Sequence, residues 1–121
     1  MRPLIHFEIY LDDPEAGQDF YSQLFDWKIS DWEGPAHYLL ASTKLGPEGP
    51  GINGALAQAG QLKGVINTVS VVDLEACCQK ISELGGKLLS EPVEVPGVGL
   101  HCYAADPEGN PFGMMQEFEQ T

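Results

Sequence analysis

Residues 106–116 have the sequence DPEGNPFGMMQ, and this stretch decides the fold. Its first five residues have the chemistry of a tight turn. Pro107 presets φ for the turn, and the Asp106 carboxylate can accept hydrogen bonds from the turn backbone. Gly109 and Asn110 both tolerate a positive φ, which many turns require. The stretch therefore predicts a turn between two strands.

The rest of the second half predicts one helix and several strands around this turn. Residues 65–72, VINTVSVV, are rich in β-branched side chains, which is typical of a strand. Asp73 can cap a helix over the following residues, and Gly85 with Gly86 supplies a common helix stop. Three further strands are predicted over residues 87–95, 99–106 and 111–118.

The first half repeats this order of elements. Residues 4–11 alternate apolar and polar side chains, as a strand does. Either Asp12 or Asp13 can cap the amphipathic helix that the spacing predicts over residues 13–25. Short strands are predicted over residues 27–31, 38–43 and 55–58. Some identities survive at an offset of 60 residues, among them Glu15 with Glu75, Ala16 with Ala76 and Leu24 with Leu84. We infer an internal duplication.

The bulk properties of the 121 residues limit the class of protein. No apolar run approaches the roughly 20 residues that a membrane helix needs, and the N-terminus lacks the regions of a signal peptide. The formal charge of −12 repels nucleic acid and anionic membranes. Three cysteines fit neither an even disulfide framework nor a paired metal-binding pattern. We therefore expect a cytoplasmic protein with no membrane and no nucleic-acid partner.

Three segments resemble the vicinal oxygen chelate superfamily, which includes glyoxalase I, bleomycin-resistance proteins and extradiol dioxygenases. They are HFEIYLDDPEAGQDFYSQLFDW, VVDLEACCQKISELGGKLLSEP and DPEGNPFGMMQ. The resemblance implies an α+β fold with two tandem βαβββ modules, 1–60 and 61–121. The modules would form a half-open cup-shaped mixed sheet with helices on its outer face. In the family the cup holds a small molecule and, in catalytic members, a divalent metal such as Ni, Zn, Fe or Mn.

The resemblance also implies where metal ligands would lie. His6 falls on the first ligand position, and the matching position of the second module falls on Asn67, or on Ile66 after a one-residue shift. The family's carboxylates would fall on Gly113 and near Asn53, neither of which is a carboxylate. The usual metal centre is therefore incomplete, and any site would use His6 with Glu8 or Glu117 as partner, or with His101.

Alternation along the strands suggests which side chains meet a ligand. His6, Glu8 and Tyr10 share one face of the first strand, where a carboxylate near an imidazole can orient a general base. The simpler alternative is a polar pair without chemistry. His101 and Tyr103 share a face later in the chain, although an exposed His101 is equally open. The predicted catalytic residues are His6 and Glu8, and the predicted ligand contacts are Tyr10, Asn53, Asn67, His101, Tyr103 and Met115.

We therefore expect a glyoxalase/bleomycin-resistance-like protein that binds a small organic molecule, or acts on it without the usual metal centre. No cofactor is expected. One alternative is a metal-dependent lyase, isomerase or dioxygenase with non-standard ligands. Another is an interaction module that offers a sheet edge to a partner. The exposed edges of two such modules also lead us to expect a homodimer.

Overall fold

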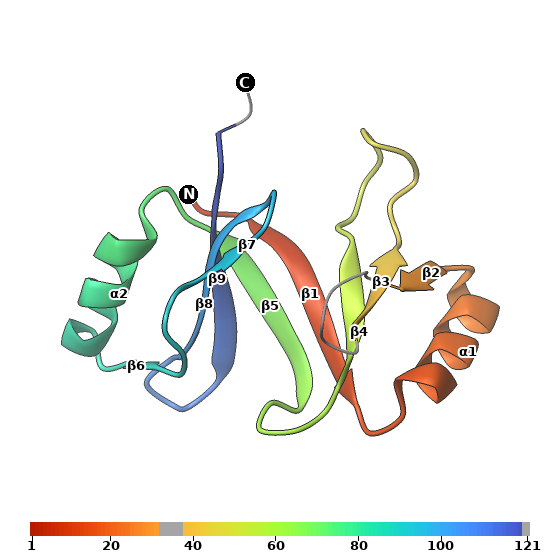
Figure 1. Cartoon of the computed structure of the whole chain (residues 1–121), viewed down its shortest axis with the longest axis horizontal. Coiled ribbons are helices and arrows are strands. Elements are labelled where there is room, and N and C mark those ends of the chain that lie inside the picture. The colour runs from red at the N-terminus through yellow and green to blue at the C-terminus, as the bar shows by residue number, and fades with distance from the viewer. Residues whose placement is uncertain (32–37, 120–121) are drawn as a thin grey trace. The chain divides into compact units, whose positions relative to one another are not determined.

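The computed structural model describes residues 1–31 and 38–119, which form two α-helices and nine β-strands (Figure 1). The chain divides into two compact units. The N-terminal unit is Ile5–Ile66, and the C-terminal unit joins Met1–Leu4 to Asn67–Thr121.

The N-terminal unit contains the first βαβββ module. Its elements are most of β1 (Leu4–Leu11), α1 (Pro14–Phe25), β2 (Lys28–Asp31), β3 (Tyr38–Ser42) and β4 (Gly54–Gln58). The strands lie in the order β2-β3-β4-β1, in which β1 and β4 run parallel and the other pairs antiparallel. Helix α1 packs against β2 and β4 (Figure 1).

The α1 helix begins as the sequence predicts. Of the two candidate caps, the Asp13 carboxylate accepts a hydrogen bond from the Ala16 backbone N–H at 3.2 Å. The Phe7 ring of β1 packs against the Trp27 ring, with the two ring centroids 5.6 Å apart. Phe7 also lies over Gly54, where a Cβ would come within 2.5 Å of its ring. Because Phe7 faces this apolar side, its neighbour Glu8 points to the opposite face of the sheet.

The C-terminal unit contains the second module. Its elements are most of β5 (Gly64–Ser70), α2 (Leu74–Glu83), β6 (Lys87–Leu88), β7 (Val93–Val95), β8 (Gly99–Ala105) and β9 (Pro111–Glu117). Strands β5 and β9 run parallel, β9 pairs antiparallel with β8, and β8 pairs with both β6 and β7. The core between α2 and these strands consists of Val71, Leu74, Cys102, Ala104 and Met114.

The turn that decides the fold has the predicted geometry. The Asp106 carboxylate accepts hydrogen bonds from the backbone N–H groups of Glu108 and Asn110, each at 2.9 Å. Hydrogen bonds from the Asn110 side chain and backbone lower the pKa of Asp106. Gly109 has a φ of 90°, which a glycine adopts without strain.

One predicted strand differs from the structure. Residues 87–95 form two short strands, β6 and β7, instead of one. Between them the backbone N–H groups of Leu89 and Ser90 both donate to the Tyr103 carbonyl, at 2.9 and 3.2 Å. Leu89 and Ser90 therefore lie opposite the single residue Tyr103, as in a β-bulge. Pro92 lacks a backbone N–H and so cannot donate the next hydrogen bond between the strands.

The predicted α+β class with two βαβββ modules is confirmed, with β6 and β7 together in the place of one strand. Among the described residues, neither helix has the length and hydrophobicity needed to cross a bilayer.

Candidate functional site

A buried carboxylate lies on the polar face of the N-terminal unit. Glu8 of β1 is only 5% exposed. The register places Ala55 of β4 beside Glu8 and Ala57 beside Tyr10, so two small side chains flank the polar pair. Tyr38 of β3 pairs with Ala57 and therefore reaches the same face. Strand pairing thus brings together groups from β1 and β3 that are 30 residues apart in sequence.

Hydrogen bonds join these groups into one cluster, which we call the Tyr38 cluster: His6, Glu8, Tyr10 and Tyr38. The Tyr38 hydroxyl donates to Glu8 Oε2 at 2.6 Å, and the Tyr10 hydroxyl donates to Glu8 Oε1 at 2.9 Å. His6 Nε2 lies 2.8 Å from the Tyr38 hydroxyl. Because that hydroxyl gives its one hydrogen to Glu8, its oxygen accepts the His6 Nε2–H. The lone pair of the neutral imidazole is then on Nδ1.

Burial sets the protonation states in the cluster. Desolvation lowers the pKa of His6 below its usual 6.5, and the nearby Glu8 charge offsets part of this effect. Burial, together with the charge and hydrogen bond of Glu8, raises the pKa of Tyr38, which therefore stays protonated. The cluster therefore holds a neutral imidazole, and the hydrogen bond to Tyr38 keeps its proton on Nε2. Such an imidazole can accept a proton at its other nitrogen.

A second polar group lies in the C-terminal unit, on β5, β8 and β9. His101 is only 8% exposed, so the alternative of a solvent-exposed His101 is wrong. Its ring packs edge-on to Tyr103, with centroids 4.5 Å apart. The register pairs His101 with Met115 and Tyr103 with Gly113. Three predicted ligand contacts, His101, Tyr103 and Met115, therefore share one face.

The remaining predicted site residues lie elsewhere, and their roles stay predictions. The Asn53 amide oxygen accepts hydrogen bonds from the backbone N–H groups of Thr43, at 2.9 Å, and Lys44, at 3.2 Å, across the β3–β4 connection. Asn67 is exposed and, by alternation, lies on the face of β5 opposite its neighbour Thr68. Glu117 ends β9 and accepts a hydrogen bond from the Ser70 hydroxyl at 3.5 Å.

The residues present do not fit the family's usual metal centre. His6 Nε2 and Glu8 Oε2 are both engaged by the Tyr38 hydroxyl. The resemblance implies a carboxylate at Gly113, which has no side-chain donor atom, and the Asn53 oxygen is already shared by two backbone groups. Within residues 1–31 and 38–119, no three His, Cys, Asp or Glu side chains gather as a metal-binding group.

Sequence reasoning missed two residues of these polar faces, Tyr38 and Thr68. Tyr38 begins a predicted strand, but its contact with Glu8 depends on how β3 and β4 pair with β1, which one sequence does not reveal. Thr68 lies beside the predicted Asn67. Thr68 is only 1% exposed. Alternation of buried and exposed positions within residues 65–72 could have predicted this burial from the sequence.

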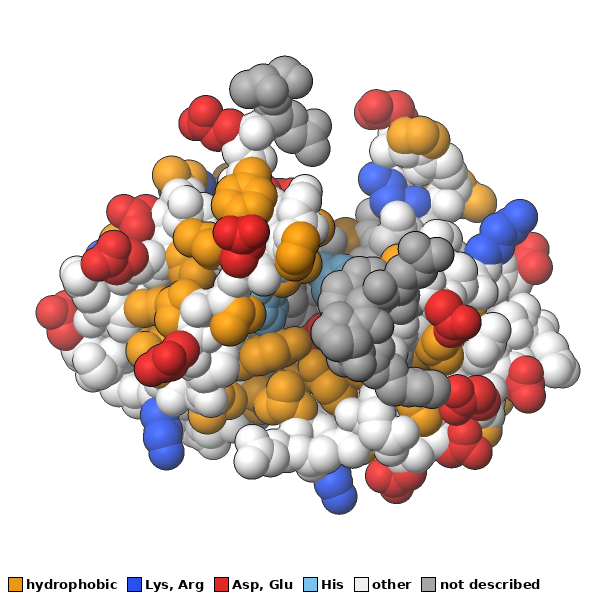
Figure 2. Space-filling view, in the orientation of Figure 1, with side chains coloured by type: hydrophobic (Ala, Val, Ile, Leu, Met, Phe, Trp, Pro, Cys, Tyr) orange, Lys and Arg blue, Asp and Glu red, His pale blue; other side chains and the backbone are white. Residues whose placement is uncertain are grey.

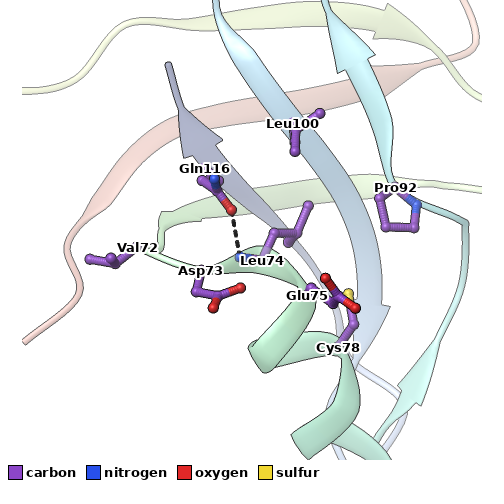
Figure 3. A pocket seen from close by; sticks show the side chains of 8 residues that line it. All are labelled: Val72, Asp73, Leu74, Glu75, Cys78, Pro92, Leu100 and Gln116. Carbon is purple, nitrogen blue, oxygen red and sulfur yellow. Dashed lines mark hydrogen bonds between the residues drawn. The ribbon is translucent and has the colours of Figure 1, made fainter. Parts of the chain in front are cut away.

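A cavity of about 620 Å³ opens at the start of α2 (Figure 3). Gln116 Oε1 accepts the Leu74 backbone N–H there at 2.8 Å. Its lining includes Leu100, which alternates with His101 and so faces the other side of β8. The cavity therefore lies away from the His101 face. Cys78 also lines the cavity. Burial, together with the neighbouring Cys102, raises the pKa of Cys78 to about 11. Its sulfur is therefore a protonated thiol at neutral pH.

The sequence profile of the Glyoxalase/Bleomycin resistance protein/Dioxygenase superfamily matches residues 4–114. The chain belongs to this superfamily. The resemblance inferred from the three sequence segments is thus confirmed, and both polar faces lie on strands of a glyoxalase-superfamily fold. A search of curated proteins finds no sequence match.

Solved structures show the same fold. A hypothetical protein from Bacillus halodurans C-125 has a TM-score of 0.71 at 16% identity, over 99% of this chain and 97% of that one. Methylmalonyl-CoA epimerase from Mycobacterium tuberculosis has a TM-score of 0.70 at 15% identity, over 96% and 88%. A superfamily member from Vibrio splendidus 12B01 has a TM-score of 0.68 at 18% identity, over 97% and 100%. At these identities the likeness concerns the fold alone.

Proposed function

We propose that this glyoxalase-superfamily protein binds a small organic molecule over the Tyr38 cluster and transfers a proton to or from it without a metal ion. One observation carries the proposal: the Tyr38 hydroxyl lies between His6 Nε2, at 2.8 Å, and Glu8 Oε2, at 2.6 Å. This arrangement resembles the general pattern of a base oriented by a second group that is itself hydrogen-bonded to a carboxylate.

In this mechanism His6 is the proton acceptor. A weakly acidic C–H or O–H of the bound molecule gives its proton to Nδ1, and the imidazole becomes an imidazolium. The Nε2–H continues to donate to Tyr38, and the negative charge of Glu8 stabilises the cation through Tyr38. Tyr10 supplies the second phenol that holds Glu8 in place. The same proton can return to the molecule, so no oxidant, reductant or co-reactant is needed.

Coenzyme A thioesters are the ligand class with which we propose to begin. Structures of similar fold include a methylmalonyl-CoA epimerase in complex with methylmalonyl-CoA and NH4+. The Streptomyces coelicolor methylmalonyl-CoA epimerase is described with 2-nitronate-propionyl-CoA. A thioester acidifies the C–H next to its carbonyl, which suits a neutral imidazole base. The other predicted small-molecule contacts remain proposals, each within its own unit: Asn53 in the N-terminal unit, and Asn67, His101, Tyr103 and Met115 in the C-terminal unit.

The test combines binding and proton exchange, with a chelator present throughout. We expect methylmalonyl-CoA to raise the melting temperature of the protein, and the proton next to its carbonyl to exchange with deuterium in D2O, as followed by NMR. His6→Gln should abolish exchange, and Tyr38→Phe should slow it strongly. Tyr21→Phe is the matched control, because the Tyr21 ring stacks on Trp27 at 5.0 Å outside the cluster.

Two results would overturn the proposal. One is exchange that disappears in the chelator and returns with Ni, Zn, Fe or Mn, which would favour the metal-dependent alternative. The other is the absence of any ligand-induced rise in melting temperature across a broader metabolite panel, which would favour an interaction module.

The proposal includes a homodimer in the cytoplasm. The free thiols of Cys77, Cys78 and Cys102 suit a reducing compartment. Helix α1 leaves Phe20 and Leu24 more than half exposed, which supports a covered apolar surface in a dimer. Sedimentation velocity should give twice the 13.1 kDa chain mass, and a monomer at every concentration tested would contradict this expectation.

A further inference from the structure

The cavity at the start of α2 is a hollow that the proposed function does not use. Its volume of about 620 Å³ falls within the range of small-molecule sites. The register pairs Leu100 of β8 with Gln116 of β9, so both side chains lie on the face of the sheet that α2 covers. Leu74, Leu100 and Gln116 all belong to the C-terminal unit, so the cavity is complete within one unit.

The wall of the cavity is an open end of the hydrophobic core. Leu74 lines the cavity and belongs to the core between α2 and the strands. Leu100 and Cys78 also line it, and both are only partly buried against the same core. Figure 3 shows the side chains of Leu74 and Leu100 between Gln116 on one side and Pro92 on the other. An apolar group placed here would cover surface of Leu100 and Pro92 that the fold leaves open to water.

The rim of the cavity is acidic. Asp73 and Glu75 are among its lining residues. On β7, Glu94 pairs with Leu100 from the side of β8 opposite to Gln116. Because cross-strand partners share a face, Glu94 points to the same side of the sheet as the cavity. No lysine, arginine or histidine stands among the described residues that line the cavity, so its charged groups are all negative.

Helix starts commonly bind anions, but at α2 the backbone N–H groups already have acceptors. The Leu74 N–H donates to Gln116 Oε1 at 2.8 Å, and the Ala76 N–H donates to the Asp73 carboxylate at 3.1 Å. The Cys77 N–H donates to the Asp73 carbonyl at 3.2 Å. The helix start carries only about half an elementary positive charge, which is less than the charge of the two lining carboxylates. The local charge therefore favours a cation over an anion.

We propose that this cavity binds a small organic cation with an apolar body, such as a protonated arylalkylamine. The ammonium group would lie at the acidic rim near Glu75, and the ring would lie against Leu100 and Pro92. The formal charge of −12 raises the concentration of cations at the protein surface, which also favours such a ligand. The site uses no residue of the Tyr38 cluster and no residue of the His101 face, so it is independent of the proposed function.

The experiment titrates protonated benzylamine into the full chain and follows NMR chemical shifts at constant salt. Benzyl alcohol removes the charge of the probe, phenylacetate reverses it, and methylammonium removes the apolar body. We expect saturable shifts of the Leu74 and Leu100 methyl groups with benzylamine, and binding of each of the other three probes at least about fivefold weaker. The proposal is overturned if benzylamine does not bind at these leucines, or if any of the other probes binds as tightly.

Glu75→Gln tests the carboxylate at nearly constant shape. We expect benzylamine binding to weaken about threefold or more, because an uncharged amide replaces the group that faces the ammonium. Glu83→Gln is the matched control, since it removes the same charge at the other end of α2 and should change binding much less. Tyr38→Phe should leave benzylamine binding unchanged, which separates this site from the proposed function. Unchanged binding in Glu75→Gln, or an equal loss in Glu75→Gln and Glu83→Gln, would overturn the site.

Discussion

At the scale of single residues, the Tyr38 hydroxyl connects the imidazole of His6 to the carboxylate of Glu8. Alternation along β1 was enough to place His6, Glu8 and Tyr10 on one face, and the hydrogen bond from Tyr10 to Glu8 confirms that two of them meet. The partner on β3 could not be predicted, because alternation describes one strand and the pairing of strands distant in sequence depends on long-range register.

Removing that hydroxyl should destabilise the protein. In Tyr38→Phe the nearly buried Glu8 loses a short hydrogen bond, and His6 Nε2 loses its acceptor. We expect the free energy of unfolding in urea to fall by about 1–3 kcal/mol. Tyr21→Phe should change it much less. An unchanged unfolding midpoint in Tyr38→Phe would mean that the hydroxyl contributes nothing to the folded state.

The lowered pKa of His6 gives stability a defined pH dependence. Burial makes protonation of His6 harder in the folded state than in the unfolded state, whose pKa is near 6.5. The unfolded state therefore binds the proton more readily, and the stability linked to neutral His6 is complete above about pH 6.5 and is lost as the pH falls through and below that value.

His6→Gln isolates this contribution, because glutamine does not titrate. The difference in free energy of unfolding between wild type and variant should shift against the wild type as the pH falls from about 7.5 to about 5. Urea unfolding at each pH measures it. A difference that stays constant, or that shifts in favour of the wild type in acid, would show that the pKa of His6 is not lowered by folding.

At the scale of elements, helix starts were predictable and strand continuity was not. Aspartate caps at the starts of both helices follow from local chemistry, since the Asp13 and Asp73 carboxylates accept backbone N–H groups three residues ahead. The break between β6 and β7 depends on two backbone groups sharing the Tyr103 carbonyl, a pairing that apolar periodicity does not encode.

The sequence left Asp12 and Asp13 open as the cap of α1, and the structure separates them. Asp13→Ala should lower the free energy of unfolding by about 1 kcal/mol, because the Ala16 N–H loses its acceptor. Asp12→Ala is the matched control. Only the backbone carbonyl of Asp12 has a described hydrogen bond, from the Gln58 side chain, and the substitution keeps that carbonyl. An equal loss in both variants would contradict the assignment of the cap.

At the scale of the whole molecule, the duplicated order of elements was visible in the sequence because each module repeats a capped helix between strands. The positions of the polar side chains were only partly visible, because equivalent places in the two modules carry different groups, Glu8 in one and Thr68 in the other.

The net charge is also a property of the whole molecule. Figure 2 shows acidic side chains scattered over the visible face, with few basic ones between them.

Like charges spread over the surface should oppose the folded state. With 18 acidic and 6 basic residues, the formal charge is −12, and compaction brings these carboxylates closer together than they are in the unfolded chain. Raising the salt from about 0.01 M to about 0.15 M shortens the Debye length from about 30 to about 8 Å and screens the repulsion. We therefore expect the melting temperature to rise by several degrees over this range, equally with sodium and potassium chloride, as measured by calorimetry. A melting temperature that falls with salt would mean that attraction between opposite charges outweighs this repulsion.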